Sequence, residues 1–106
     1  MSNEFEPLPE KGEATSIVFT QEDLNDAQVP GIESFDDILE MGEDQAAMLA
    51  GSLFTAIYGI KVENQHCSEF DQGVPYWRGF VNEFDWEFEL DGDQWLFTIA
   101  HDAADL

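Results

Sequence analysis

The sequence feature that most constrains the fold is a strict alternation of acidic and apolar residues from Glu83 to Leu90. Successive side chains of a β-strand point to opposite faces of a sheet, so this alternation is typical of a strand with one buried and one exposed face. Asp91-Gly92, a dipeptide favoured in two-residue hairpin turns, follows directly. We therefore predict a β-hairpin whose second strand covers residues 93–101.

The predicted turn also sets the register of the two strands. With Asp91-Gly92 at the turn, Leu90 faces Asp93, and three successive pairs of large apolar side chains face each other: Phe88 with Trp95, Trp86 with Phe97, and Phe84 with Ile99. We expect these six side chains to share one buried face. The exposed face is expected to carry Glu83, Asp85, Glu87 and Glu89. A slip of one residue would move every side chain to the wrong face.

The rest of the chain predicts helices and two further strands. Residues 45–62 contain no acid, and their apolar side chains recur at helical spacing, so we expect a largely buried helix over residues 43–59. A hydrophobic surface that binds a partner is the alternative explanation for this segment. Strands are expected over residues 16–19 and 76–81, with Gly79 and Asn82 marking a bend or bulge. Short helices are expected after the capping residues Thr20, over residues 21–27, and Ser34.

These elements predict the α+β class. The expected architecture is a small single domain in which a C-terminal antiparallel β-meander packs against an apolar α-helix. A chain of 106 residues is normally one domain with a modest core. Residues 1–14 are expected to be a polar lead, which could be flexible, and residues 15–106 a single acidic α+β domain.

The charge of the chain excludes several kinds of partner. It contains 24 Asp and Glu but only 3 Lys and Arg, which gives a formal net charge of −21. The basic residues Lys11, Lys61 and Arg78 are too few to neutralise a nucleic-acid backbone, and the negative charge disfavours docking on anionic membranes. We therefore expect neither direct nucleic-acid binding nor membrane association. A single cysteine, Cys67, and the lack of a long apolar segment fit a cytoplasmic protein.

No constellation of residues predicts catalysis or metal binding. His66, Cys67 and His101 show none of the spacings of a zinc site, and nothing places a histidine beside the Cys67 sulfur as a base. The acidic turn at Gly92 does not fit an EF-hand loop, whose first and last ligand positions would fall on Glu87 and Thr98. We therefore expect a protein that is not an enzyme and that needs no cofactor and no metal.

The acidic residues form two groups that could contact a partner. In the first group, alternate strand residues about 6.8 Å apart face a strand without basic side chains. It comprises Glu83, Asp85, Glu87, Glu89, Asp91 and Asp93. The second group surrounds the helix after Ser34 and comprises Glu33, Asp36, Asp37, Glu40, Glu43 and Asp44. Like charges at such spacings cost stability, so something other than stability must account for them.

In size, charge and aromatic-rich α+β character, the chain resembles the DNA-mimic inhibitors of phages and mobile elements. These include anti-restriction proteins, anti-CRISPR proteins and uracil-DNA glycosylase inhibitors. The resemblance implies an inhibitor that occupies the DNA- or RNA-binding site of a basic host protein.

Two other functions remain open. One is an immunity or inhibitor protein for a single basic enzyme, such as a toxin nuclease, with an aromatic hot spot at Tyr76 and Trp77 beside Arg78. The other is a cytosolic protein of a halophile, whose acidity serves solubility alone. The oligomeric state is open as well, a homodimer included.

Overall fold

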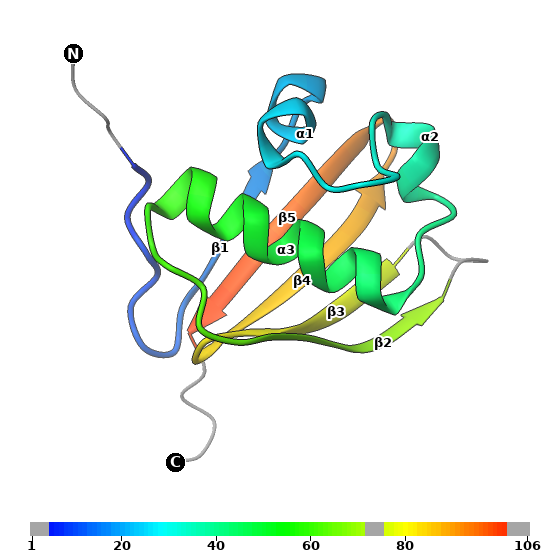
Figure 1. The fold of residues 1–106 in the computed structure, drawn as a ribbon. Coiled ribbons are helices and arrows are strands. Elements are labelled where there is room, and N and C mark those ends of the chain that lie inside the picture. The colour runs from blue at the N-terminus through cyan, green and yellow to red at the C-terminus, as the bar shows by residue number, and fades with distance from the viewer. Residues whose placement is uncertain (1–4, 72–75, 102–106) are drawn as a thin grey trace.

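The computed structural model describes residues 5–71 and 76–101 of the chain (Figure 1). These residues form a five-stranded antiparallel sheet with the strand order β1-β5-β4-β3-β2. The strands are β1 (Ala14–Val18), β2 (Gln65–Asp71), β3 (Tyr76–Val81), β4 (Phe84–Asp91) and β5 (Gln94–His101), and the helices are α1 (Gln21–Ala27), α2 (Phe35–Ile38) and α3 (Glu43–Tyr58). Figure 1 shows these helices on one side of the sheet, the inner face, and none of the described helices covers the other side, the outer face. The predicted α+β class and single small domain are confirmed.

The core lies between α3 and the inner face of the sheet. The six apolar side chains that the hairpin pattern assigned to one face are all buried, with at most 6% of their surface exposed: Phe84, Trp86, Phe88, Trp95, Phe97 and Ile99. From α3, Leu49, Leu53 and Phe54 are fully buried, and the Phe54 ring centre lies 5.6 Å from that of Phe84. The predicted packing of the β-meander against an apolar helix is therefore confirmed.

The predicted register of the hairpin is wrong by two residues. The turn is Gly92-Asp93 rather than Asp91-Gly92, because Asp91 still pairs with Gln94 as the last step of the β-ladder. Gly92 has a φ of 64° at the first central position, where a type II′ turn favours glycine. Leu90 consequently faces Trp95, and Phe88 faces Phe97.

The shift in register leaves the predicted buried and exposed faces of the hairpin strands unchanged. The shift changes each partner by two residues, and the side-chain period of a strand is also two. Every residue therefore keeps its predicted side of the sheet. Glu83 and Glu89 are exposed, while Asp85 and Glu87 are half-buried.

Helix-capping signals located the helices well. At α1, the Thr20 hydroxyl accepts a hydrogen bond from the Asp23 amide, and the Asp23 carboxylate accepts one from the Thr20 amide. At α2, the Asp37 carboxylate accepts hydrogen bonds from the backbone N–H groups of Glu33 and Ser34. Helix α3 ends at Gly59, whose φ of 72° is the left-handed conformation that glycine adopts freely.

Strand β2 was not predicted. Its residues Gln65–Asp71 show no clean alternation, because β2 is an edge strand with a bulge between Cys67 and Glu69. Gly79 lies opposite the bulge, where a Cβ atom would collide with the His66 carbonyl oxygen. The expected irregularity at Gly79 therefore lies in the strand that faces it.

Candidate functional site

A row of acidic side chains follows β4 along the outer face of the sheet. It consists of Asp85, Glu87, Glu89 and Asp91, which alternate with the buried residues Phe84, Trp86 and Phe88. We call these four residues the β4 row. Alternate residues of a strand are about 6.8 Å apart, so the ladder fixes the spacing of the backbone positions that carry the carboxylates. Glu83 lies outside the row, in the turn between β3 and β4, and Asp93 lies in the turn between β4 and β5.

The two neighbours of β4 differ in character. On β5, the residues that face the row are uncharged: Ala100, Thr98, Leu96 and Gln94. On β3, Arg78 faces Glu87, with Phe80 and Tyr76 facing Asp85 and Glu89. The compensating charge of Arg78 was not predicted, because the sequence pattern pairs the row only with β5.

Aromatic side chains of β3 lie beside the β4 row. The Tyr76 hydroxyl donates a hydrogen bond of 3.3 Å to the Glu87 carboxylate. Burial, together with the negative charge of Glu87, raises the pKa of Tyr76 above its ordinary value. Phe80 is 41% exposed, and its ring centre lies 5.1 Å from that of His66 on β2. This part of the outer face therefore offers flat apolar surface beside carboxylates.

The structure removes Trp77 from the expected hot spot at Tyr76 and Trp77, and a binding role of Tyr76 stays a prediction. Trp77 is fully buried on the inner face, where its ring lies 5.9 Å from that of Trp95 and its Nε1 donates to the Met41 carbonyl oxygen. It cannot contact a partner. Adjacent strand residues point to opposite faces, so Tyr76 and Arg78 remain on the outer face without it.

The second group of acids surrounds α2; we call it the α2 group. Most of its members are exposed: Glu33, Asp36, Glu40, Glu43 and Asp44. Asp37 is half-buried, and its carboxylate caps α2 through the two hydrogen bonds described above. Glu43 and Asp44 lie in the first turn of α3, where the helix dipole favours negative charge.

The two groups meet at one end of the sheet. The Phe35 ring of α2 lies 6.0 Å from that of Phe19, and the Phe19 amide donates to the carbonyl oxygen of Trp95, the residue after Gln94. Helix α2 thus lies over the end where β4 and β5 turn. Asp91, the last residue of the β4 row, and Asp93 in the turn lie at this end, whereas Glu83 lies at the opposite end.

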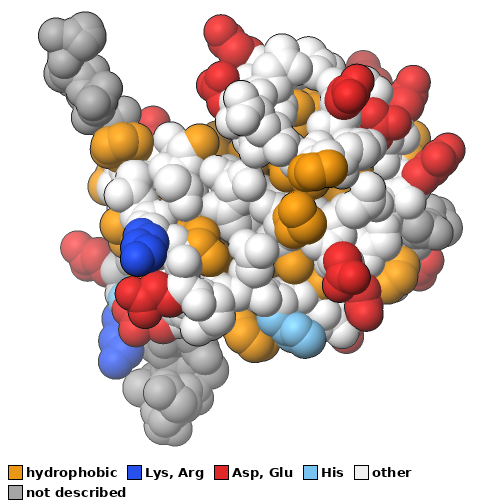
Figure 2. Space-filling model, viewed as in Figure 1, with side chains coloured by type: hydrophobic (Ala, Val, Ile, Leu, Met, Phe, Trp, Pro, Cys, Tyr) orange, Lys and Arg blue, Asp and Glu red, His pale blue; other side chains and the backbone are white. Residues whose placement is uncertain are grey.

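Figure 2 shows the same distribution from the helix side. Acidic side chains gather along the upper and right-hand rim, where α1 and α2 lie, and the surface over the middle of α3 is largely free of them. The molecule therefore combines an acidic rim with an uncharged central surface on this side.

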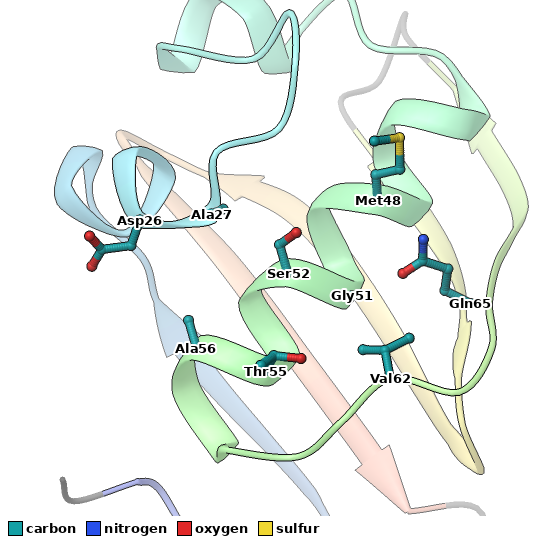
Figure 3. Close-up of a pocket in the computed structure, with 9 residues that line it drawn as sticks. All are labelled: Asp26, Ala27, Met48, Gly51, Ser52, Thr55, Ala56, Val62 and Gln65. Carbon is teal, nitrogen blue, oxygen red and sulfur yellow. The ribbon is translucent and has the colours of Figure 1, made fainter.

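The uncharged surface contains a groove of about 450 Å³ along α3 (Figure 3). Side chains of α3, including Met48, Ser52 and Thr55, run through the middle of its lining. Asp26 and Ala27 of α1 lie on one side of α3, and Val62 and Gln65 lie on the other. Met48, Thr55 and Ala56 are exposed yet uncharged, so burial alone does not explain the acid-free segment. The lining offers one carboxylate, from Asp26, together with hydroxyl and amide groups. A partner-binding role for this segment stays a prediction.

The fold keeps His66, Cys67 and His101 apart. His66 and Cys67 are consecutive in β2 and point to opposite faces, and strands β3 and β4 separate β2 from His101 on β5. Cys67 is buried, and both burial and the charge of Glu43 raise the pKa of its thiol. Among residues 5–71 and 76–101, no cluster of three or more His, Cys, Asp or Glu side chains is arranged to hold a metal ion.

Comparison of this chain with known proteins identifies no relative. Neither the family models, nor the curated proteins, nor the solved structures contain a match to this chain. Within the described part of the chain, no helix has the length and apolar character needed to cross a membrane.

Proposed function

We propose that this protein is an acidic inhibitor that occupies the DNA- or RNA-binding site of a basic protein by mimicking nucleic acid. The observation that carries the proposal is the β4 row on the sheet face that no described helix covers, with Asp93 and the α2 group at one end of it. Only Arg78 compensates this charge on the outer face of the described sheet.

The physical basis is electrostatic. A net charge of −21 attracts a basic partner over a long range and accelerates encounter, and binding displaces the counterions that surround both proteins. The β-ladder already orders the backbone that carries these carboxylates, so little backbone order has to be gained on binding. A phage or mobile element is the expected source of such an inhibitor, and the cytoplasm its expected place of action.

A second candidate function is inhibition of one basic enzyme through a compact hot spot. The observation that favours it is the exposed ring of Phe80 beside Asp85, with Tyr76 and Arg78 on the same strand. Aromatic and arginine side chains dominate the binding energy of many protein interfaces. In this case a few residues, rather than the summed charge, would control affinity.

The test begins with a pull-down from a bacterial lysate at low salt, followed by elution with a salt step and identification of the captured protein. Labelled duplex DNA is then competed from that protein by the wild type and by a variant with four reversals: Asp85→Lys, Glu89→Lys, Asp91→Lys and Asp93→Lys. Glu87 is kept because it accepts the hydrogen bond of Tyr76 and faces Arg78. Each reversal changes the charge by two, so the net charge becomes −21 + 8 = −13.

The matched control reverses Glu6, Glu10, Glu13 and Glu63, which are exposed and lie outside both acidic groups, and it also has a net charge of −13. Mimicry by the outer face predicts that the first variant loses far more competing power than the control. Equal losses would show that only the overall charge matters. The hot-spot candidate instead predicts that Phe80→Ala or Tyr76→Ala alone removes most of the affinity.

A further inference from the structure

The two edges of the sheet differ in their protection against pairing with another strand. Strand β2 carries a bulge at Ser68 and the acidic residues Glu69 and Asp71, which are typical devices that keep an edge from pairing. Strand β1, at the opposite edge in Figure 1, has none of these. Its sequence Ala14–Val18 is uncharged, and no bulge interrupts its ladder with β5.

The outward backbone groups of β1 have no hydrogen-bond partner among residues 5–71 and 76–101. In an antiparallel ladder the residues of an edge strand alternate between those bonded to the neighbour and those that point away. The Phe19 amide bonds to Trp95 on β5, so Thr15 and Ile17 share its direction, and Ala14, Ser16 and Val18 point outward. No backbone hydrogen bond joins these outward groups to another described residue.

The surface beside this edge is the least charged part of the outer face. Ala14, Ser16 and Val18 lie next to Ala100, Thr98 and Leu96 of β5, and all six are uncharged. Val18 is 45% exposed, although it is an apolar residue next to another apolar residue. Two molecules that each carry a charge of −21 repel each other least where their contact surfaces are neutral.

We infer that β1 is a homodimer interface, in which the β1 edges of two copies pair antiparallel to form one continuous ten-stranded sheet. A two-fold axis at Ser16 gives an isologous contact in which Ser16 faces Ser16 of the second copy. Ala14 then faces Val18 of the second copy, so small side chains lie opposite a β-branched one without a charge nearby. The inference does not depend on the proposed function.

If the proposed function is correct, the dimer would also present the β4 row twice, and this consequence rests on the proposed function. The strand order would become β4-β5-β1-β1-β5-β4, so five strand spacings, or about 24 Å, separate the two β4 rows. The rows run in opposite directions because the axis relates them. A symmetric dimeric target would then meet the same acidic row twice.

The test uses disulfide trapping. A hydrogen-bonded antiparallel pair has its Cα atoms about 5.5 Å apart, within the range that a disulfide bridges. Ser16→Cys in a Cys67→Ala background should therefore form a covalent dimer under mild oxidation. The matched control is Ser68→Cys in the same background, because Ser68 is also an exposed serine on an edge strand.

We expect the Ser16→Cys protein to cross-link about tenfold faster than the control, because pairing raises the effective concentration of the two thiols. We also expect the wild type to associate reversibly in sedimentation experiments at about 0.5 M NaCl, where the repulsion between copies is screened. Equal cross-linking of the two variants would overturn the inference. A wild type that remains monomeric up to about 0.5 mM at that salt concentration would overturn it too. Neither readout involves a nucleic-acid-binding target, so this inference and the proposed function fail independently.

Discussion

Arg78 faces Glu87 across the β3–β4 pairing and Glu69 across the β2–β3 pairing. The one arginine or lysine on the outer face of the described sheet thus lies between two acidic strands. The positive charge of Arg78 reduces the repulsion between these strands. It also makes the electrostatic potential beside the β4 row less negative for an approaching partner. Arg78 therefore lowers the repulsion between acidic strands and at the same time weakens the attraction of the outer face for a basic partner.

We predict that Arg78→Gln strengthens binding to the captured basic protein severalfold at low salt. The matched control is Lys11→Gln, because Lys11 is exposed, lies in the N-terminal segment, and loses the same single charge. Titration at low and high salt measures both effects. A gain that is equal for the two variants would place the binding surface away from the outer face, and a loss specific to Arg78→Gln would favour the hot-spot candidate.

Periodicity made most of the fold predictable. The alternation from Glu83 to Leu90 specified two faces, and the structure keeps residues 84–90 on their predicted sides, whereas Glu83 lies in the turn before β4. The turn was misplaced by one residue because Asp-Gly fits a type I′ turn while Gly92 also fits the first position of a type II′ turn. Local sequence does not choose between these turns, and neither does the alternation, because both turns leave the same side chains on the buried face.

The candidate site was only partly predictable, because its composition depends on which strands are neighbours. The β4 row follows from the alternation alone. Arg78, Tyr76 and Phe80 join it only because β3 pairs with β4 in one particular register. Strand β2 was missed altogether, since a bulged, exposed edge strand lacks the alternation that marks a half-buried one.

Asn82 joins the β3–β4 turn to the segment before β2, and its replacement should be costly. Its Oδ1 accepts hydrogen bonds from the amides of Glu63 and Asn64, and its Nδ2 donates to the carbonyl oxygen of Lys61. We predict that Asn82→Ala lowers the free energy of unfolding by about 2–3 kcal/mol, since each lost bond contributes about 1 kcal/mol. Denaturant titration measures this change.

Asn82→Ala should destabilise the fold in two ways, by removing the hydrogen bonds and by placing alanine in an unfavourable backbone conformation. The variant Asn82→Gly separates these two effects. Asn82 has a φ of 54°, which alanine adopts less readily than asparagine or glycine. The glycine variant loses the hydrogen bonds but tolerates the backbone conformation, so it should be more stable than the alanine variant by about 1 kcal/mol. If both variants unfold like the wild type, the side-chain bonds of Asn82 do not contribute to stability.

Tyr58 should make the fold sensitive to alkaline pH. Its side chain is buried, its hydroxyl has no hydrogen-bond partner among the described residues, and burial followed by the charge of Glu6 raises its pKa above the ordinary value near 10. The folded state therefore binds this proton more tightly than the unfolded state. The resulting stability is complete below pH 10 and is lost as the pH rises through the raised pKa.

Tyr58→Phe is expected to reduce this alkaline loss. At pH 7 the variant should match the wild type within about 1 kcal/mol or exceed it, because it removes a buried hydroxyl that makes no hydrogen bond. Thermal unfolding between about pH 7 and pH 11 compares the two proteins across the range in which tyrosine ionises. Parallel curves would mean that Tyr58 is not the group responsible for the decline.

Salt should stabilise the fold, because 24 acidic residues repel one another with only 3 basic residues to compensate. The Debye length falls from about 30 Å at 0.01 M salt to well under 10 Å at 0.5 M, so added salt screens most of this repulsion. We predict that the midpoint of thermal unfolding rises by several degrees over that range.

The −13 variants described above provide the control for this effect. Each removes the same amount of net charge, but only the first thins out the β4 row and the adjacent turn. A salt effect that arises from close repulsion within the row should shrink most in that variant, whereas one that arises from the overall charge should shrink equally in both. Sucrose, which is excluded from protein surfaces without screening charge, should raise the midpoints of all three proteins alike. A wild-type midpoint that does not change between low and high salt would show that the acids are spaced too widely, or are too well compensated, to destabilise the fold.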